Sequence, residues 1–377
     1  MNNRKKIIIV IALIVSLICL CSGHFLFDWQ VLEKNIDTVH EESGKSTTDL
    51  PVKYSHINTV INNNRQEIDV LEVDLSTRKA DISPVLSHGR LFGFEELSRI
   101  ISRSNAYAAI NAGFFYEYGD PSGMVVSDGR LITKSSGKFP VFAIKGGKAE
   151  LTEINNEIYM LHNGARIDIT DINRIGKAGN VVLYTPDFGI DNRTAISNTS
   201  IIIKNNKVIG VNKNKAPTAI PKGGSVMTFF EPYQYDFEAL PIKEGDSINF
   251  VCEPGISPDM QAYECGSWIV KDGKSVAPQK DDWVGLLTNR DPRTIVGIKG
   301  DGIVVLMTVD GRQPGYSVGV SAKELAHFLI DYGIRDAAML DGGASTEMIV
   351  QGKIVNKPSY KGKERPLGGA LVVRVKD

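Results

Sequence analysis

The sequence has almost no net charge and few of the residues that bind transition metals. Its 377 residues include 43 Lys and Arg against 44 Asp and Glu, so the formal net charge is -1. No overall field therefore attracts nucleic acid or another polyanion, and any anion site has to be local. The 6 histidines show no metal-ligand spacing, which argues against zinc. Calcium or magnesium held by carboxylates stays open, and no cofactor is predicted.

Cysteine is also scarce, and no internal repeat is evident. Of the 4 cysteines, Cys19 and Cys21 belong to an apolar N-terminal segment, which leaves Cys252 and Cys265 as the one pair elsewhere. A disulfide between these two closes a loop of reasonable length in an oxidising compartment. The alternative is a pair of buried free thiols, since spacing alone does not settle the geometry.

One long apolar run stands at the N-terminus. Arg4, Lys5 and Lys6 precede an almost unbroken apolar stretch from Ile7 to Cys21. Residues 1–27 are therefore predicted to be a single transmembrane anchor or a cleaved signal peptide, with the N-terminus in the cytoplasm and the rest of the chain outside. Residues 28–55 are polar and lack an apolar period, which is typical of a linker.

Residues 56–377 are predicted to fold as one domain of mixed α+β class, with a large mixed sheet and flanking helices. Alternating apolar residues predict strands at 68–75 and 80–85, a short helix is expected at 94–102, and a buried strand at 107–110. Between about 140 and 275 short strands alternate with turn dipeptides such as Asn205-Asn206 and Asp272-Gly273.

The last hundred residues predict a strand, a helix and a second strand. The apolar run 303–309 ends in Asp310, Ser321 and Glu324 form a capping box for a helix ending at Gly333, and the run 337–340 ends in Asp341. Such a unit places its strands parallel in one sheet, so the two acids are expected at the same edge, on the order of 5 to 10 Å apart. Paired carboxylates at this separation do acid and base work. The alternative is that each Asp-Gly simply forms a turn.

Arginines surround this pair of acids in the sequence. They are Arg293 in Asp291-Pro-Arg-Thr, Arg312 in Asp310-Gly-Arg and Arg365 in Glu364-Arg-Pro. The planar guanidinium holds two phosphate oxygens at once and stays charged at physiological pH, so these residues suit phosphate binding. Structural pairing with neighbouring acids such as Asp291 or Glu364 is the alternative.

A third polar cluster follows the predicted strand at 107–110. Asn111 is placed to hydrogen-bond a sugar hydroxyl or a phosphate oxygen, or else to cap a turn. Phe114 and Phe115 would give an apolar platform for a sugar ring or belong to the core.

Together these motifs resemble the phosphodiester glycosidase family. The likeness runs from about Ala108 to Val373, and its specificity comes from the order and spacing of several motifs. Ala112 and Ala344 stand where the family commonly has glycine. The motifs are Asn111-Ala-Gly-Phe-Phe, Ser122-Gly-Met, Asp291-Pro-Arg-Thr, Asp310-Gly-Arg, Leu340-Asp-Gly-Gly-Ala-Ser and Glu364-Arg-Pro.

The resemblance implies an enzyme that cleaves the bond between a sugar's anomeric carbon and phosphate, acting on a phosphate-containing surface glycan. Bacterial members are exported or tethered to the membrane, and are often labelled exopolysaccharide-related. We expect Asp341 to be the base or oxocarbenium stabiliser, Asp310 a second acid/base or positioning group, and Arg293 a catalytic phosphate ligand. The predicted substrate-binding residues are Asn111, Gly113, Gly123, Arg312, Gly342, Gly343, Ser345 and Arg365.

Two other functions fit the same residues. A non-catalytic module that binds wall glycan would use the fold without turnover. A metal-dependent phosphodiesterase would hold a divalent ion with Asp310, Asp341 and Asp291 and cut the P–O bond.

Overall fold

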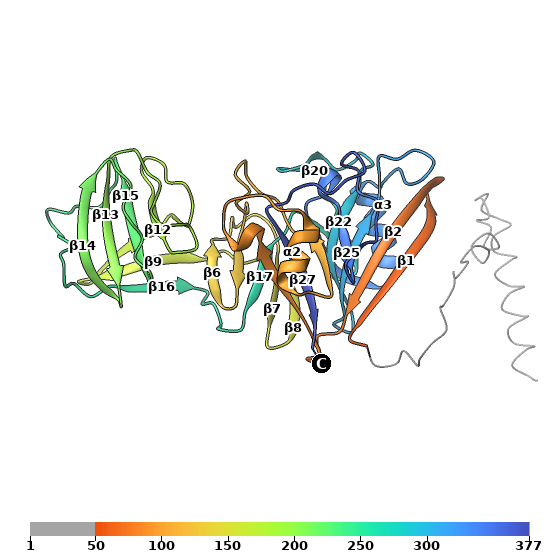
Figure 1. The fold of residues 1–377 in the computed structure, drawn as a ribbon, viewed down its shortest axis with the longest axis horizontal. Helices are drawn as coiled ribbons and strands as arrows, with labels where there is room; N and C mark the ends of the chain where they lie inside the picture. The colour runs from red at the N-terminus through yellow and green to blue at the C-terminus, as the bar shows by residue number, and fades with distance from the viewer. Residues whose placement is uncertain (1–49, 377) are drawn as a thin grey trace, which may run out of the picture. The chain divides into compact units, whose positions relative to one another are not determined.

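Two antiparallel sheets packed face to face hold the residues of the predicted site (Figure 1). The computed structural model describes residues 50–376, so the predicted membrane segment and most of the predicted linker lie outside the described residues. One sheet has seven strands in the order β1-β2-β23-β22-β24-β18-β19, and the other has five in the order β26-β25-β4-β27-β3. All the neighbouring strands in both sheets pair antiparallel.

Strand β1 alternates between more and less buried residues, whereas the central strands β22, β23 and β4 are nearly continuous runs of buried residues. The seven-stranded sheet consists of β1 (Val52–Ile61), β2 (Asn64–Val73), β23 (Val304–Val309), β22 (Arg293–Lys299), β24 (Ile334–Met339), β18 (Trp268–Lys271) and β19 (Lys274–Ser275). The five-stranded sheet consists of β26 (Lys353–Ile354), β25 (Met348–Val350), β4 (Ala108–Asn111), β27 (Gly369–Val375) and β3 (Ala80–Leu86).

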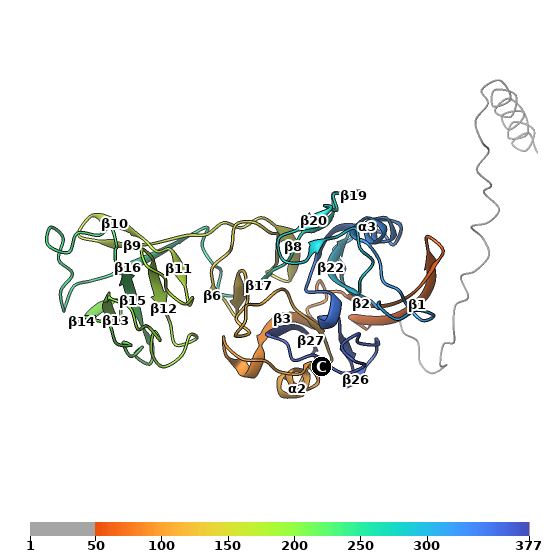
Figure 2. The same cartoon turned by 90° about the horizontal axis from the view of Figure 1, so that it is seen from above.

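Apolar side chains from both sheets fill the space between them. Leu71, Leu306 and Val296 of the seven-stranded sheet pack in one core cluster with Ile110 and Leu371 of the five-stranded sheet. The outer face of each sheet is covered by one helix. Leu325 and Leu329 of α3 (Ala322–Asp331) pack on the seven-stranded sheet. Helix α2 (Leu97–Ser104) packs on the five-stranded sheet, and Figure 2 shows the two helices at opposite sides of the sandwich.

The remaining strands form smaller sheets between β4 and β22 along the chain. A five-stranded sheet has β6 (Arg130–Thr133), β5 (Val125–Ser127), β17 (Gln261–Glu264), β7 (Val141–Lys145) and β8 (Lys148–Thr152). Another contains β11 (Asp171–Ile172), β12 (Val181–Tyr184), β15 (Gly224–Phe230), β13 (Asn198–Lys204) and β14 (Lys207–Asn214). The others are β10 (Ala165–Asp168), β9 (Glu157–His162) and β16 (Asn249–Glu253), and the hairpin of β20 (Lys280–Asp281) and β21 (Gly285–Leu286).

The predicted fold class needs correction. The described residues are mostly β, with α2 and α3 as their α-helices, and the large sheet is antiparallel rather than mixed. Most of the predicted strands were individually correct. The parallel direction predicted for β23 and β24 suggested a mixed sheet, but β22 lies between these two strands and pairs antiparallel with both. Strand β1 begins at Val52, so the folded domain starts four residues before the predicted boundary at 56.

The predicted strand, helix and strand near the C-terminus are confirmed. The capping box of Ser321 and Glu324 is present at the start of α3. Strands β23 and β24 both pair antiparallel with β22, which lies between them, so they run in the same direction. Their C-terminal ends therefore meet at one edge of the sheet.

The predicted disulfide is wrong. Cys252 and Cys265 are free thiols, one in β16 and the other just after β17, in different sheets. Thirteen residues of sequence separation carried no information about which sheet each residue joins. Among residues 50–376, neither helix has the length and hydropathy that crossing a bilayer requires.

Candidate active site

The loop that follows β24 is fixed at three points and carries Asp341. The Asp341 amide donates to the Ala112 carbonyl at 3.1 Å, and the Gly343 amide donates to the Pro292 carbonyl at 2.8 Å. The side-chain amide of Asn111 donates to the Asp341 carbonyl at 2.6 Å. The loop is thereby attached to the end of β4 and to the residue before β22, so its position depends on both sheets.

Asn111 holds this loop with both ends of its side chain. Its Oδ1 accepts from the Thr294 hydroxyl at 2.9 Å and from the Glu347 amide at 3.1 Å. Since the side chain is 1% exposed and bonded at both ends, it is placed to position the Asp341 loop. Its predicted contact with a sugar hydroxyl or a phosphate oxygen stays a prediction.

The carboxyl group of Asp341 has a raised pKa. Burial raises the pKa to about 6, opposed by the Ser345 hydroxyl and by the charge of Arg365. Arg365 Nη1 donates to Ser345 Oγ at 2.7 Å, which brings both predicted residues to the same place. Tyr263 lies close as well, since burial and the charge of Asp341 both raise the pKa of its phenol. A carboxyl with a pKa near 6 is suited to proton transfer near neutral pH.

Arg293 is a buried cation held by backbone carbonyls. Its side chain is 2% exposed, and its Nε and Nη2 donate to the carbonyls of Val320 and Asn289 at 3.1 and 2.9 Å. No carboxylate of residues 50–376 lies within ion-pair distance of Arg293, and burial lowers the pKa of the guanidinium. A buried cation without an acidic partner is costly unless an anion binds beside it.

The two glycines after Asp341 bring the loop against the arginines. A Cβ at Gly342 would lie 2.9 Å from the Pro292 carbonyl oxygen and 3.9 Å from Cδ of Arg293. Gly343 has a φ of +61°, and a Cβ there would lie 3.2 Å from Nη2 of Arg312. Gly342 therefore lets the loop pass the Pro292 carbonyl next to the Arg293 side chain, and Gly343 supplies a positive φ beside the Arg312 guanidinium.

Arg312 pairs with an acid, as the structural alternative predicted. Its Nε donates to Asp291 Oδ1 at 2.8 Å, and the Arg312 side chain is half exposed. The charge of Arg312 contributes to lowering the pKa of Arg293, so the two guanidinium groups are near each other. Asp291 forms its ion pair with Arg312, and its charge also acts on Arg293 without contacting that guanidinium.

Gly113 and Gly123 serve close packing beside the site. A Cβ at Gly113 would lie 2.9 Å from the ring of Tyr263, and one at Gly123 would lie 2.5 Å from the carboxyl carbon of Glu264. The Glu264 carboxylate accepts from the amides of Met124 and Ser136, both at 2.9 Å. These glycines therefore position β17 and Tyr263 rather than offer their own groups to a ligand.

Asp310 ends its strand at the same edge but in different surroundings. One strand separates β23 from β24, which corresponds to about 10 Å. Both carboxylate oxygens of Asp310 are occupied, Oδ1 by Asn356 Nδ2 at 3.0 Å and Oδ2 by the Lys357 amide at 2.8 Å. Burial raises the pKa of Asp310 to about 6, and the side chain is 1% exposed. These contacts favour the positioning role over direct acid/base work.

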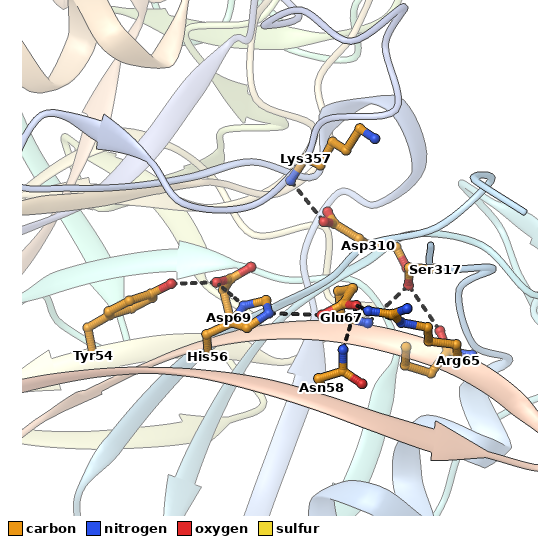
Figure 3. Close-up of polar contacts among 10 residues, drawn as sticks. Tyr54, His56, Asn58, Arg65, Glu67, Asp69, Asp310, Ser317 and Lys357 are labelled. Atoms are coloured by element: carbon orange, nitrogen blue, oxygen red, sulfur yellow. Dashed lines mark hydrogen bonds and ion pairs between the residues drawn. The ribbon is translucent and has the colours of Figure 1, made fainter. Parts of the chain in front are cut away.

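Next to Asp310 lies a partly buried polar network on β1 and β2, which Figure 3 shows. His56 contacts Asp69 Oδ1 through Nδ1 and Glu67 Oε2 through Nε2, both at 2.9 Å, and Tyr54 donates to Asp69 at 2.7 Å. Ser317 Oγ donates to the Asp310 carbonyl at 2.6 Å. The network attaches the β1–β2 hairpin to the loop after β23.

Several residues of the site were not found from the sequence. Glu347 is 1% exposed, and burial together with Glu364 raises its pKa to about 9. Tyr263 and Arg174 come from segments far from any motif. The one available signal was Glu347 itself, an acid directly before the apolar run 348–350.

A family model and several known proteins match this chain. Residues 189–374 match the model described as phosphodiester glycosidase, which includes the loops of Arg293, Arg312 and Asp341 but not Asn111, Gly113 or Gly123. An uncharacterized protein of the SPbeta prophage of Bacillus subtilis is 34% identical over 116 residues, 31% of this chain and 18% of that protein. An uncharacterized protein of Rickettsia conorii is 22% identical over 228 residues, 55% of this chain and 76% of that protein.

Solved structures that superpose with TM-scores above 0.5 show the same fold. A hypothetical protein from Synechocystis superposes with a TM-score of 0.74 at 18% identity, covering 86% of this chain and 62% of that one. A protein of Burkholderia pseudomallei described as exported gives 0.68 at 22% identity, covering 83% and 74%. The catalytic domain of zebrafish N-acetylglucosamine-1-phosphodiester alpha-N-acetylglucosaminidase gives 0.47 at 15% identity, covering 89% and 87%.

The matched part spans less than a fifth of the Bacillus subtilis relative. Because the solved structures share so little sequence identity with this chain, their similarity establishes the fold alone. The family model, however, covers the C-terminal motifs from which the resemblance was first inferred. That resemblance is therefore confirmed by the match of residues 189–374 to the phosphodiester glycosidase model, which supports a hydrolase of the glycosidase type.

Proposed function

We propose that this protein hydrolyses sugar 1-phosphodiesters by cleaving the bond between the anomeric carbon and the phosphate oxygen. The observation that carries the proposal is the position of Arg293, a buried guanidinium without an acidic partner, against the loop of Asp341. A phosphate group at Arg293 would supply the missing negative charge. Arg312, beside Gly343, would share the same phosphate.

We assign to Asp341 the role of the base that accepts a proton from the attacking water. Its pKa of about 6 leaves the carboxyl ionised at neutral pH and still basic enough to accept a proton. Water attacks the anomeric carbon and gives its proton to Asp341, while the bond from that carbon to the phosphate oxygen breaks. The bonding pair leaves with the phosphate monoester, whose charge the arginines stabilise.

The leaving group explains why a second strong acid is not required. A phosphate monoester departs far more readily than a sugar alkoxide, so positioning and charge stabilisation have to do most of the work. We therefore assign Asp310 to positioning, since its oxygens hold Asn356 and Lys357. Asn111 fixes the Asp341 loop, and Ser345 with Arg365 faces the carboxyl group.

The metal-dependent alternative gains no support from the described residues. In residues 50–376 no three His, Cys, Asp or Glu side chains converge as a metal site. Asp291 is paired with Arg312, and both oxygens of Asp310 are bonded. The glycan-binding alternative would use the same arginines and differs only in giving no product.

The direct test is product analysis. The chain is incubated with the methyl phosphodiester of N-acetylglucosamine 1-phosphate, and the products are identified. Free sugar and methyl phosphate would establish glycosidic cleavage. Sugar 1-phosphate would mean P–O cleavage, and no product with several sugars would leave binding as the function.

We also propose that the reaction takes place outside the cytoplasm, on a phosphate-containing surface glycan. Support comes from the three basic residues before the apolar run at 7–21. Protease added to intact cells should degrade the domain without prior lysis, and protection of the domain would contradict this location.

A further inference from the structure

Two partly exposed aromatic rings lie beside the motif that contains Asn111 and Phe114. Tyr116 is 44% and Trp283 37% exposed, and their rings meet edge to face with centroids 5.2 Å apart. Phe114, which is buried, stacks against Trp283 with an angle of 7° and centroids 5.7 Å apart. We call Tyr116 and Trp283 the aromatic rim.

The rim is connected to the site through short contacts. A Cβ at Gly266 would lie 2.7 Å from the ring of Phe114 and 3.5 Å from the carbonyl oxygen of Met339, the last residue of β24. Met339 also donates its amide to the Ser267 carbonyl at 3.0 Å. The Phe114 ring on which Trp283 stacks is therefore packed against Gly266, whose amide donates to the Met339 carbonyl at 2.7 Å, two residues before Asp341.

A buried carboxylate fixes the turn that presents Trp283. Asp281 is 3% exposed, and its Oδ1 accepts from the amides of Trp283 at 2.7 Å and Val284 at 3.2 Å, while Oδ2 accepts from the Ser267 amide. The charge of Asp281 also acts on Arg293 and opposes the lowering of its pKa, so the turn lies near that guanidinium. A large ring held this rigidly costs little conformational entropy when a ligand binds.

Two arginines lie against aromatic rings in the segment that contains Tyr116. The guanidinium of Arg174 lies 5.3 Å from the ring centroid of Tyr116, and its Nη2 donates to the Gly123 carbonyl at 3.3 Å. Arg365, which contacts Ser345 in the site, lies 5.4 Å from the ring of Phe115. Arg365 therefore joins the aromatic segment that contains Phe115 to Ser345, which faces Asp341.

We propose that the aromatic rim is the subsite for the sugar ring, with Trp283 stacking on the apolar face of a pyranose whose phosphate lies at Arg293. This inference rests on the proposed function, because it assumes that one ligand carries both groups. A pyranose has C–H bonds on its faces and hydroxyls around its edge, so a partly exposed ring next to a cation site suits it. Neither Trp283 nor Tyr116 belongs to any motif of the resemblance.

The test separates sugar binding from turnover. Full-length chain carrying Asp341→Asn is titrated by calorimetry with methyl phosphodiesters of N-acetylglucosamine, glucose and galactose 1-phosphate, and with dimethyl phosphate as the sugar-free probe. Adding Trp283→Ala should raise Kd for the best sugar ligand tenfold or more and leave Kd for dimethyl phosphate within twofold. Trp283→Phe should restore binding to within about threefold, since the ring is kept.

Tyr159→Ala is the matched control, because it removes another partly exposed ring, on β9, and should change neither Kd. Equal Kd values with and without Trp283, or no binding of any of the sugars, would overturn the subsite. If the sugar binds through Trp283 but the wild-type chain gives no product, the subsite stands and the proposed hydrolysis fails.

Discussion

Asp341 and Asp310 end two strands of one sheet, yet their carboxyl groups meet different partners. The Asp310 carboxylate accepts hydrogen bonds from the side-chain amide of Asn356 and the backbone amide of Lys357, and neither amide can take up a proton from it. The carboxyl of Asp341 instead faces the hydroxyl of Ser345 and the charged guanidinium of Arg365, which are hydrogen-bonded to each other. Burial raises the pKa of both, so the pKa alone does not distinguish their roles.

The pH dependence of activity follows from the raised pKa of Asp341. If the ionised carboxyl is the base, kcat/KM should rise as the pH increases through about 6 and then level off. Asp341→Asn should lower turnover at least about 100-fold with an unchanged melting temperature. The measurement is a pH–rate profile with a sugar 1-phosphodiester.

Asp310→Asn is the control for this assignment, because the pKa of Asp310 is also raised to about 6. The midpoint should persist in this variant if Asp341 is responsible. A profile that falls through pH 6 would mean that the protonated form is active, contrary to the role proposed for Asp341.

Arg293 should be sensitive to replacement by lysine. Lysine keeps the charge but cannot donate to two backbone carbonyls and a phosphate in the fixed geometry of the guanidinium. We expect Arg293→Lys to weaken competitive inhibition by methyl phosphate by roughly 10- to 100-fold, as one or two charged hydrogen bonds are lost. Arg130→Lys changes an exposed arginine paired with Asp187 and should have no effect. Equal inhibition constants in both variants would exclude Arg293 from phosphate binding.

At the scale of elements, the hairpin of β1 and β2 brings buried charges to the edge of the sandwich. Glu67 and Asp69 alternate along β2 and therefore point to the same face, opposite Asn58 and His56 of β1. That face continues into the apolar core through Leu71. The polar network occupies the end of the core nearest Asp310 (Figure 3).

His56 should make the stability of this hairpin depend on pH. Its hydrogen bonds to Asp69 and then Glu67 raise its pKa from 6.5 to about 9, although burial opposes this. Because the folded pKa exceeds the unfolded one, the stabilisation is complete below about pH 6.5 and is lost as the pH rises through 9. Its size should not exceed about 2 kcal/mol, because exposure of the ring screens the pairs.

The measurement is urea unfolding of wild type and His56→Gln at pH 6 and pH 9.5. The difference between the two proteins should be larger at pH 6. The same difference at both values would show that His56 is not charged in the folded protein.

At the scale of the whole molecule, the two sheets meet at the site, and the cysteines lie in two other sheets. Cys265 is 3% exposed, and burial raises its pKa to about 12. Cys252 is half-buried. Labelling the native chain with a maleimide should modify Cys252 slowly and leave Cys265 unmodified, and unfolding should expose both. Peptide masses identify the modified residue, and a cross-linked peptide of the two cysteines would contradict the structure.

Much of the local structure was predictable from particular residues. The capping box of Ser321 and Glu324 fixed the start of α3, because its hydrogen bonds join residues three apart in the chain. Turn pairs such as Asn205-Asn206 marked a hairpin, as both residues have positive φ. The apolar runs before Asp310 and Asp341 predicted the strands β23 and β24, each followed by an acid.

The sequence by itself determined these local elements and the order of the motifs, because helix caps, turns and strand periods depend on residues a few positions apart. It did not determine that Asp310 bonds to Asn356 while Asp341 faces Arg365, nor that Trp283 stacks on Phe114. Those contacts join segments tens to hundreds of residues apart. Only the packing of the two sheets decides them, since burial and pKa depend on which distant side chains exclude water from each group.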